Sequence, residues 1–201
     1  MKRPQKGFTL MELLIVIGIL GILAAGLLAA IDPFEQLKKA RDTNNRSSAL
    51  SLVSAFTSYY ANHGSFPWNK QSTVVGDLCR RSLLANPPLA ALCALGTGAM
   101  DLQPTASSVM AACVGDSVVK DGELKSTFLA GIGETHIYVA SDTTDSTNVW
   151  VCYAPEGKAA RTDVSTKYSI GAIQANGTYR LTVDPALCPL VTSDKCAQCF
   201  Q

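Results

Sequence analysis

The chain begins with a long apolar stretch. Phe8 to Ile31 is an apolar run of 24 residues that contains a single ionisable residue, Glu12. As an α-helix the run would be about 36 Å long, which is enough to cross a hydrocarbon core of about 30 Å. A carboxylate at that depth costs several kcal/mol unless something satisfies it. The pattern therefore predicts a membrane-spanning helix whose one carboxylate needs a partner.

A second helical pattern follows, and it is amphipathic. Its apolar positions recur at i, i+3, i+4 and i+7 spacing, and they are Ala49, Leu52, Val53, Phe56, Tyr59 and Tyr60. The basic residues before them fall among polar neighbours, as expected of a solvated stretch: Lys38, Lys39, Arg41 and Arg46. This stretch therefore predicts a helix that leaves the membrane and then buries one face.

Proline and glycine set the limits of this helix. Pro33 removes a backbone donor, so a kink is expected there, and Gly64 suits a left-handed helix end. We therefore expect one kinked helix over residues 8–63, membrane-embedded over 8–31 and amphipathic over 32–63.

The last third of the chain changes to a β pattern. β-branched and aromatic residues, separated by turn-forming clusters, occupy Thr135–Ala140, Asn148–Tyr153, Tyr168–Gln174 and Thr178–Val183. Asn176-Gly177 is a hairpin signal, because a type I′ turn needs positive φ at both central positions. Before the strands, short helices are expected over Leu78–Ala85, Leu89–Leu95 and Ala106–Val114. The expected fold class is α+β, with an antiparallel sheet packed on the second half of the helix and a head spanning 64–201.

The residues before the apolar run orient it. Lys2, Arg3 and Lys6 precede it without any acid, so residues 1–7 should stay on the cytoplasmic side. A cleaved secretory signal has a similar basic start, but its apolar region is usually about 7–15 residues long. Ala24-Ala25-Gly26 would be the cleavage site in that case. A simple membrane anchor also fits the run but leaves the carboxylate unexplained.

The start of the run carries a more specific signal. Lys6-Gly7-Phe8-Thr9-Leu10-Met11-Glu12-Leu13-Leu14-Ile15-Val16-Ile17 resembles the class III signal of type IV pilins and type II secretion pseudopilins. The resemblance implies that residues 1–7 are a leader, that a prepilin peptidase and methyltransferase cuts after Gly7, and that it methylates Phe8. It also implies that Glu12 guides assembly on an inner-membrane platform with other pilins. One departure is that Pro33 lies at position 26 of the cleaved chain, whereas many family members place a proline near position 22.

The resemblance implies a structural role. The chain is expected to be a subunit of a type IV pilus-like filament, single-pass in the inner (cytoplasmic) membrane and then extracellular, polymerising through its apolar helix. Alternatives are a pseudopilin of a type II secretion system, a competence pilus subunit, or a membrane-tethered binding domain that never polymerises. Glu12 separates the last alternative from the others, because a tether is expected to have no use for it.

Other classes of function find little support in the sequence. The formal net charge is +1, and the leader carries +3 of side-chain charge, so the remainder is about −2 and does not suggest a general polyanion binder. There is no G-x-S-x-G, P-loop or H-E-x-x-H motif, and the two histidines, His63 and His136, are expected to be surface or partly packed residues. Neither an enzyme nor a cofactor is expected.

The cysteines indicate a disulfide frame. All seven lie from Cys79 onward, in the part expected to face outward, where disulfides persist. Cys188 is expected to pair with Cys196 or Cys199. The other expected pairs are Cys79 with Cys93 and Cys113 with Cys152.

No metal site is expected. Cys196 and Cys199 have C-x-x-C spacing, but no second such pair is present to complete a zinc site. Asp142, Asp145 and Asn148 share a polar loop that could offer oxygens to calcium, but their order is not that of an EF-hand, so an ordinary turn is favoured.

The first testable prediction concerns processing at the Gly7-Phe8 bond. Mass analysis of the mature protein should find a chain that begins with methylated Phe8. Gly7→Val should leave uncut precursor in the membrane, because the larger side chain obstructs the protease at its cleavage point. A mature start at Leu27 would instead establish an ordinary secreted protein.

Overall fold

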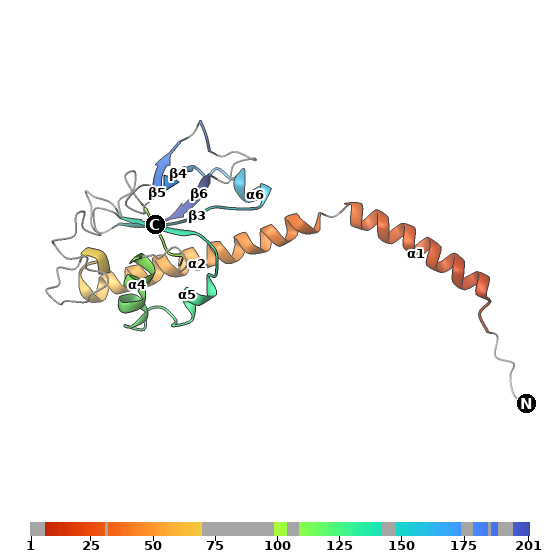
Figure 1. Cartoon of the computed structure of the whole chain (residues 1–201), viewed down its shortest axis with the longest axis horizontal. Coiled ribbons are helices and arrows are strands. Elements are labelled where there is room, and N and C mark those ends of the chain that lie inside the picture. Colours follow the sequence, from red (N-terminus) through yellow and green to blue (C-terminus); the bar gives the residue numbers. More distant parts are fainter. Residues whose placement is uncertain are drawn as a thin grey trace, which may run out of the picture. The chain divides into compact units, whose positions relative to one another are not determined.

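The structure is a computed structural model, and it describes residues 7–30, 32–69, 99–103, 109–141, 148–173, 179–184, 186–188 and 195–201 (Figure 1). The chain divides into two compact units, Met1–Leu37 and Lys38–Gln201, and each is described by itself. The expected helices over Leu78–Ala85 and Leu89–Leu95, the Asn176-Gly177 turn and the residues Asp142 and Asp145 lie outside the described residues.

The first unit is dominated by helix α1 (Leu10–Ala30), which is apolar except for Glu12 in its first turn. Within the described residues, the stretch Leu10–Leu28 has a mean hydropathy of 2.5 and is long and apolar enough to cross a membrane. Helix α2 (Pro33–His63) follows, so the expectation of a single kinked helix over 8–63 is wrong. The Asp32 carboxylate accepts hydrogen bonds from the backbone N–H of Phe34 at 3.0 Å and of Glu35 at 3.3 Å. Asp32 is thus an N-cap, and Pro33 occupies the first helical position, where proline is favoured.

The second unit is built on α2. Its residues Ala49, Leu52, Ala55, Phe56 and Tyr59 are buried, which confirms the predicted amphipathic face. The helix ends at His63, and Gly64 follows with φ of +71°, in the left-handed region expected of it. A short 3₁₀ turn, η1 (Pro67–Asn69), then places the Trp68 ring against Phe56, with the ring centroids 5.1 Å apart.

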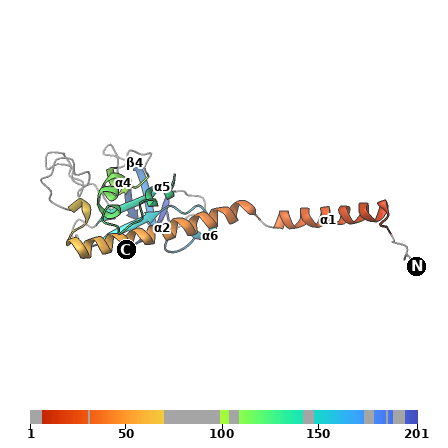
Figure 2. The same cartoon turned by 90° about the horizontal axis from the view of Figure 1, so that it is seen from below.

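An antiparallel sheet of six strands lies alongside α2 in Figures 1 and 2. Its order is β1-β2-β3-β6-β4-β5, formed by β1 (Met100–Asp101), β2 (Ile137–Ser141), β3 (Val149–Tyr153), β4 (Tyr168–Ile173), β5 (Tyr179–Val183) and β6 (Cys196–Phe200). The four predicted strands are confirmed as β2 to β5. The strands β1 and β6 were not predicted, and β6 pairs with both β3 and β4 near the middle of the sheet.

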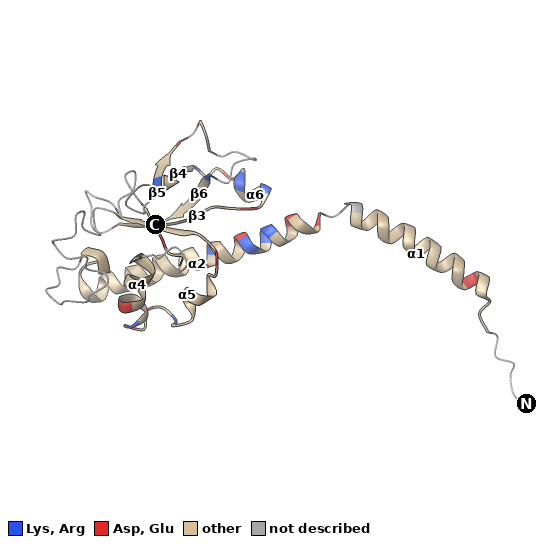
Figure 3. Cartoon of the chain, viewed as in Figure 1, with Lys and Arg blue, Asp and Glu red and all other residues tan. Residues whose placement is uncertain are grey.

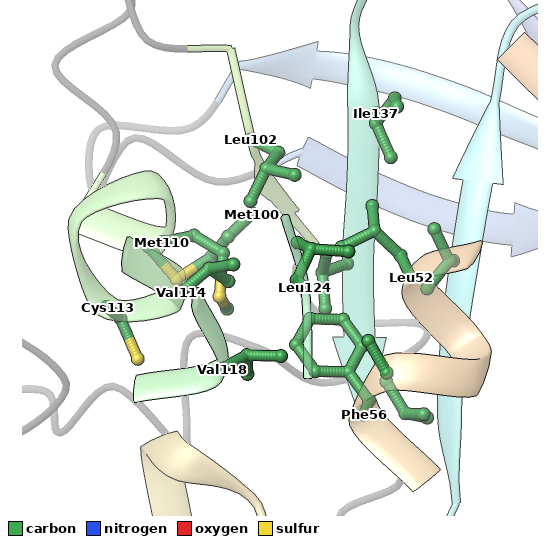
Figure 4. Packing of buried hydrophobic residues seen from close by; sticks show 14 of the residues in the cluster. Leu52, Phe56, Met100, Leu102, Met110, Cys113, Val114, Val118, Leu124 and Ile137 are labelled. Carbon is green, nitrogen blue, oxygen red and sulfur yellow. The ribbon is translucent and has the colours of Figure 1, made fainter. Parts of the chain in front are cut away.

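Short helices complete the second unit. They are α4 (Val109–Val114), which continues into the π-helical turn η3 (Gly115–Val119), α5 (Phe128–Gly131) and α6 (Lys158–Arg161). The expected helix over Ala106–Val114 therefore forms at least over its last six residues. Figure 4 shows Leu52 and Phe56 of α2 in the buried cluster that also contains Leu124 and Ile137 of β2.

A buried carboxylate ties α2 to the segment between β3 and β4. Asp42 is only 5% exposed, and its two oxygens accept hydrogen bonds from the backbone N–H groups of Glu156 at 2.7 Å and Gly157 at 2.8 Å. Arg41, its neighbour on α2, forms an ion pair with Glu156 at 3.2 Å on the surface. Gly157 directly precedes α6. Asp42 therefore fixes the position of α6 beside the first half of α2.

This contact generates the second testable prediction. Asp42→Ala leaves two buried N–H groups without an acceptor, and a hydrogen bond to a charged group contributes about 1.5–3 kcal/mol. We expect the free energy of unfolding of the second unit to fall by about 3 kcal/mol in Asp42→Ala, and by less in Asp42→Asn, which keeps one acceptor oxygen. Denaturant titration of the full chain in detergent measures both. Thr43→Ala, which alters an exposed neighbour on the same helix, should change stability little.

Candidate assembly site

The chain just before α1 forms a capping box around Glu12. Thr9 donates to the Glu12 carboxylate twice, from its backbone N–H and from its hydroxyl, each at 2.9 Å. In return, the backbone N–H of Glu12 donates to the Thr9 hydroxyl oxygen at 3.3 Å. This is the T-x-x-E arrangement that satisfies N–H groups at a helix start.

The capping box changes the interpretation of Glu12. From the sequence, a simple tether was expected to have no use for this carboxylate, but the structure gives it a role within one chain. That expectation is therefore wrong as stated, although an additional role between subunits is compatible with the cap. Gly7 and Phe8 lie immediately before the box, and the Phe8 side chain is 86% exposed. A free amine made at Phe8 by cleavage would be adjacent in sequence to the residue that already binds the carboxylate.

Helix α1 offers a continuous apolar surface. All of its Leu, Ile, Val and Met side chains described by the structure are at least half exposed within this chain: Leu10, Met11, Leu13, Leu14, Ile15, Val16, Ile17, Ile19, Leu20, Ile22, Leu23, Leu27 and Leu28. A helix that is apolar all round belongs in lipid or in the interior of an assembly. The surface therefore needs a cover that the single chain does not supply.

Two disulfides fix β6 within the head. Cys188 bonds to Cys196, which is one of the two pairings that the sequence left open. Cys152 of β3 bonds to Cys199 of β6, directly across the two paired strands, so the expected pair of Cys113 with Cys152 is wrong. The reason is the unpredicted strand β6, which brings Cys199 opposite Cys152 with their Cα atoms 4.0 Å apart. Cys113 is disulfide-bonded as well. Cys79 and Cys93 lie outside the described residues.

Each histidine packs on a tyrosine ring or contacts a carboxylate. His63 stacks on Tyr59 with ring centroids 4.0 Å apart, and its Nε2 lies 3.3 Å from a carboxylate oxygen of Asp121. His136 is half-exposed and contacts the buried carboxylate of Asp101. Among the residues that the structure describes, no three His, Cys, Asp or Glu side chains are grouped so that they could hold a metal ion.

A polar network surrounds Tyr153 beside the Asp42 contact. The Tyr153 hydroxyl donates to Gln198 of β6 at 2.9 Å, and the Gln198 amide donates to Ser165 at the same distance. Burial, followed by the nearby carboxylate of Asp42, raises the pKa of Tyr153 to about 12. Tyr153 therefore stays neutral over the whole physiological range and acts as a structural donor.

A groove of about 690 Å³, which no pattern in the sequence predicts, lies between α2 and the segment 123–132. One wall carries serines of α2, and the other carries Leu124, Phe128 and Ile132. Glu123 in this groove accepts hydrogen bonds from Ser58 at 2.5 Å and from the Asn62 amide at 2.6 Å. Because both oxygens of Glu123 are engaged, the carboxylate fastens this segment to α2.

The fold is therefore pilin-like α+β, with a long N-terminal apolar helix followed by an antiparallel sheet. Residues 2–28 match the model of the prokaryotic N-terminal methylation motif. The chain is 45% identical over 75 residues to a fimbrial protein of Neisseria meningitidis serogroup B, which is 37% of this chain and 43% of that protein. It is also 45% identical over 75 residues to the type IV major pilin protein PilE1 of Neisseria gonorrhoeae, covering 37% of this chain and 44% of that pilin.

These matches confirm the resemblance of residues 6–17 to the type IV pilin family. The matched region spans less than half the length of these relatives. No solved structure matches the chain.

The third prediction concerns the two disulfides. Non-reducing peptide mapping should recover Cys152 linked to Cys199 and Cys188 linked to Cys196. These bonds close sequence separations of 47 and 8 residues. In the chain-entropy model, their removal should cost about 4 and about 2.5 kcal/mol respectively. Cys152→Ser with Cys199→Ser should therefore destabilise the head more than Cys188→Ser with Cys196→Ser, as measured by denaturant titration. A zinc ion bound to reduced Cys188, Cys196 and Cys199 would contradict this assignment.

Proposed function

We propose that the chain is a structural subunit of a type IV pilus-like filament. It is inserted in the cytoplasmic membrane as a precursor, cleaved after Gly7 by a prepilin peptidase and methylated at Phe8. An inner-membrane platform then assembles it with other pilins, and α1 enters the core of the filament. The observation that carries the proposal is α1 itself, because it lies almost wholly within the matched methylation motif and its apolar surface is uncovered in the single chain.

The energetics of assembly indicate a role for Glu12 in the contact between subunits. Moving α1 from lipid to a filament core gains no hydrophobic free energy, since lipid tails are as apolar as leucine. Packing and polar pairing must therefore drive the step. In a low-dielectric core the attraction between charges depends steeply on distance. A pair formed by Glu12 and the Phe8 amine of a neighbouring chain would select one axial register.

Three alternatives remain, and two of them share the assembly chemistry. A pseudopilin of a type II secretion system or a competence pilus subunit would carry the same α1, cleavage site and carboxylate. A membrane-tethered domain that never polymerises also fits the capping box, because this gives Glu12 a use in a single chain. The cap and the charge of Glu12 must therefore be tested separately.

The fourth prediction separates them with three variants. Glu12→Leu removes the cap and the charge, whereas Glu12→Gln removes the charge but keeps a side chain that completes a capping box. Thr9→Ala removes the two capping bonds of the hydroxyl, leaves the backbone N–H bond to Glu12, and keeps the charge. We expect both Glu12 variants to insert normally and to lose filament incorporation by at least roughly ten-fold, because a charge-assisted hydrogen bond contributes about 1.5–3 kcal/mol. Thr9→Ala should incorporate much better than either.

Membrane level and filament incorporation are scored separately, by immunoblotting of membranes and of sheared filaments. Absence of the unmodified chain from sheared filaments at normal membrane level would favour the tether. Normal incorporation of Glu12→Gln at normal membrane level would show that only the cap matters and would overturn the charge pair between subunits. Failure of Thr9→Ala together with success of Glu12→Gln would lead to the same conclusion.

A further inference from the structure

The second unit has a cationic face at the end where α2 enters it. We define this face by seven basic residues: Lys38, Lys39, Arg41 and Arg46 of α2, and Lys158, Arg161 and Lys167 on and after α6. Figure 3 shows the blue segments of α2 and α6 near each other, and the turned view in Figure 2 also places α6 beside α2.

Specific contacts hold the two parts of the face together. Asp42 binds the backbone of Gly157, which immediately precedes Lys158. The Arg161 Nε donates to the carbonyl of Pro155 at 3.0 Å, and the Thr166 hydroxyl donates to the carbonyl of Ala160 at 2.6 Å. The second contact places Lys167 next to α6. These contacts hold α6 and Lys167 beside the basic stretch of α2.

The face has a clear surplus of positive charge. Seven basic residues stand against three acidic ones, Asp42, Glu156 and Asp163, which leaves a surplus of four. Asp42 is buried and its oxygens are engaged by backbone donors. Asp32 and Glu35 precede the face on the chain and reduce the surplus without cancelling it. Such a surface suits an anionic partner.

The face lies within a short length of chain from the apolar helix. The three peptide links from Ala30 to Pro33 span at most about 11 Å, and α2 rises about 9 Å from Pro33 to Lys39. Lys39 therefore lies within about 20 Å of the end of α1 at any angle between the helices. The polar region of a bilayer extends roughly 5–8 Å beyond the hydrocarbon, and charges act over a further Debye length of about 8 Å. A membrane spanned by α1 would have its headgroups within reach of this face.

The position of these charges is unexpected for membrane topology. Basic residues near a span favour the cytoplasmic side, and the leader already supplies Lys2, Arg3 and Lys6 there. The four basic residues of α2 follow the span and would lie on the non-cytoplasmic side. Their charge therefore works against an orientation with residues 1–7 in the cytoplasm. Membrane insertion therefore does not explain these four basic residues, whereas contact with anionic lipid headgroups would explain them.

We propose that the cationic face docks on anionic phospholipid headgroups at the outer surface of the membrane and holds the head against the bilayer before assembly. The inference rests on the proposed function, because it requires α1 to span a membrane. Each basic residue near an anionic surface contributes about 1 kcal/mol, which corresponds to roughly five-fold in the docking equilibrium.

The test uses the full chain, one copy per nanodisc, in zwitterionic lipid alone or with one third phosphatidylglycerol. Hydrogen exchange should be slower at residues 38–46 and 156–167 in the anionic discs, and high salt should abolish the difference. Lys39→Gln with Lys158→Gln should lower the ratio of docked to free heads by roughly 25-fold. The matched control, Lys120→Gln with Lys125→Gln, removes equal charge from exposed positions outside the face and should retain the lipid-dependent protection.

Resistance to alkaline extraction reports insertion separately in each preparation. A chain that is inserted but shows equal exchange in both lipids overturns the docking proposal and leaves the proposed function intact. Slow hydrogen exchange that appears only with several chains per disc, whatever the lipid, would mean that the face binds a second copy of the chain. This result also overturns the docking proposal. A chain that fails to insert in either lipid contradicts the proposed function itself.

Discussion

Burial of one face of α2 is the interaction on which the rest of the head depends. Leu52 and Phe56 are fully buried in a cluster that includes residues of β2 and β3, and truncation of such side chains typically costs about 2–5 kcal/mol each. Away from this cluster the contact becomes polar, and Asp42 continues it by binding two backbone N–H groups. A carboxylate can be buried there only because each of its oxygens has a donor. Helix α2 is thus held to the head by apolar packing along one stretch and by the hydrogen-bonded carboxylate of Asp42 along another.

The main elements of the fold could be predicted because their patterns are local. Strands β2 to β5 alternate or carry β-branched and aromatic residues, and Gly64 ends α2 for the conformational reason that the sequence suggested. Strand β6 was missed because Cys196-Ala-Gln-Cys-Phe200 has no strand pattern of its own. Its conformation is set by pairing with β3 and β4, which are distant in sequence. The break between α1 and α2 was predicted only as a kink, although Asp32 followed by Pro33 is a recognisable helix start.

The sequence predicted which residues make up the candidate site better than it predicted their contacts. The sequence showed that Glu12 needs a partner. The structure supplies Thr9, and the T-x-x-E spacing of the two residues was a signal that could have predicted this. The disulfide partner of Cys152 could not have been chosen from spacing, because it depends on the register of β6. Nor does anything local distinguish Asp42 from the charged residues around it. Its burial follows from the position of the Pro155–Gly157 segment, which only the folded chain defines.

The central position of β6 has a consequence for biosynthesis. Of the described strands, β6 comes latest along the chain, yet β3 and β4 flank it within the sheet. If the part of the chain after α1 crosses a membrane in sequence order, β2 to β5 emerge before β6 and leave a vacant position between β3 and β4. The sheet can close only once residues 196–200 have been delivered, and until then the unpaired edges are open to misassociation. During export of this chain, the incompletely folded head would need to be kept from contact with other chains until β6 has crossed the membrane and paired with β3 and β4.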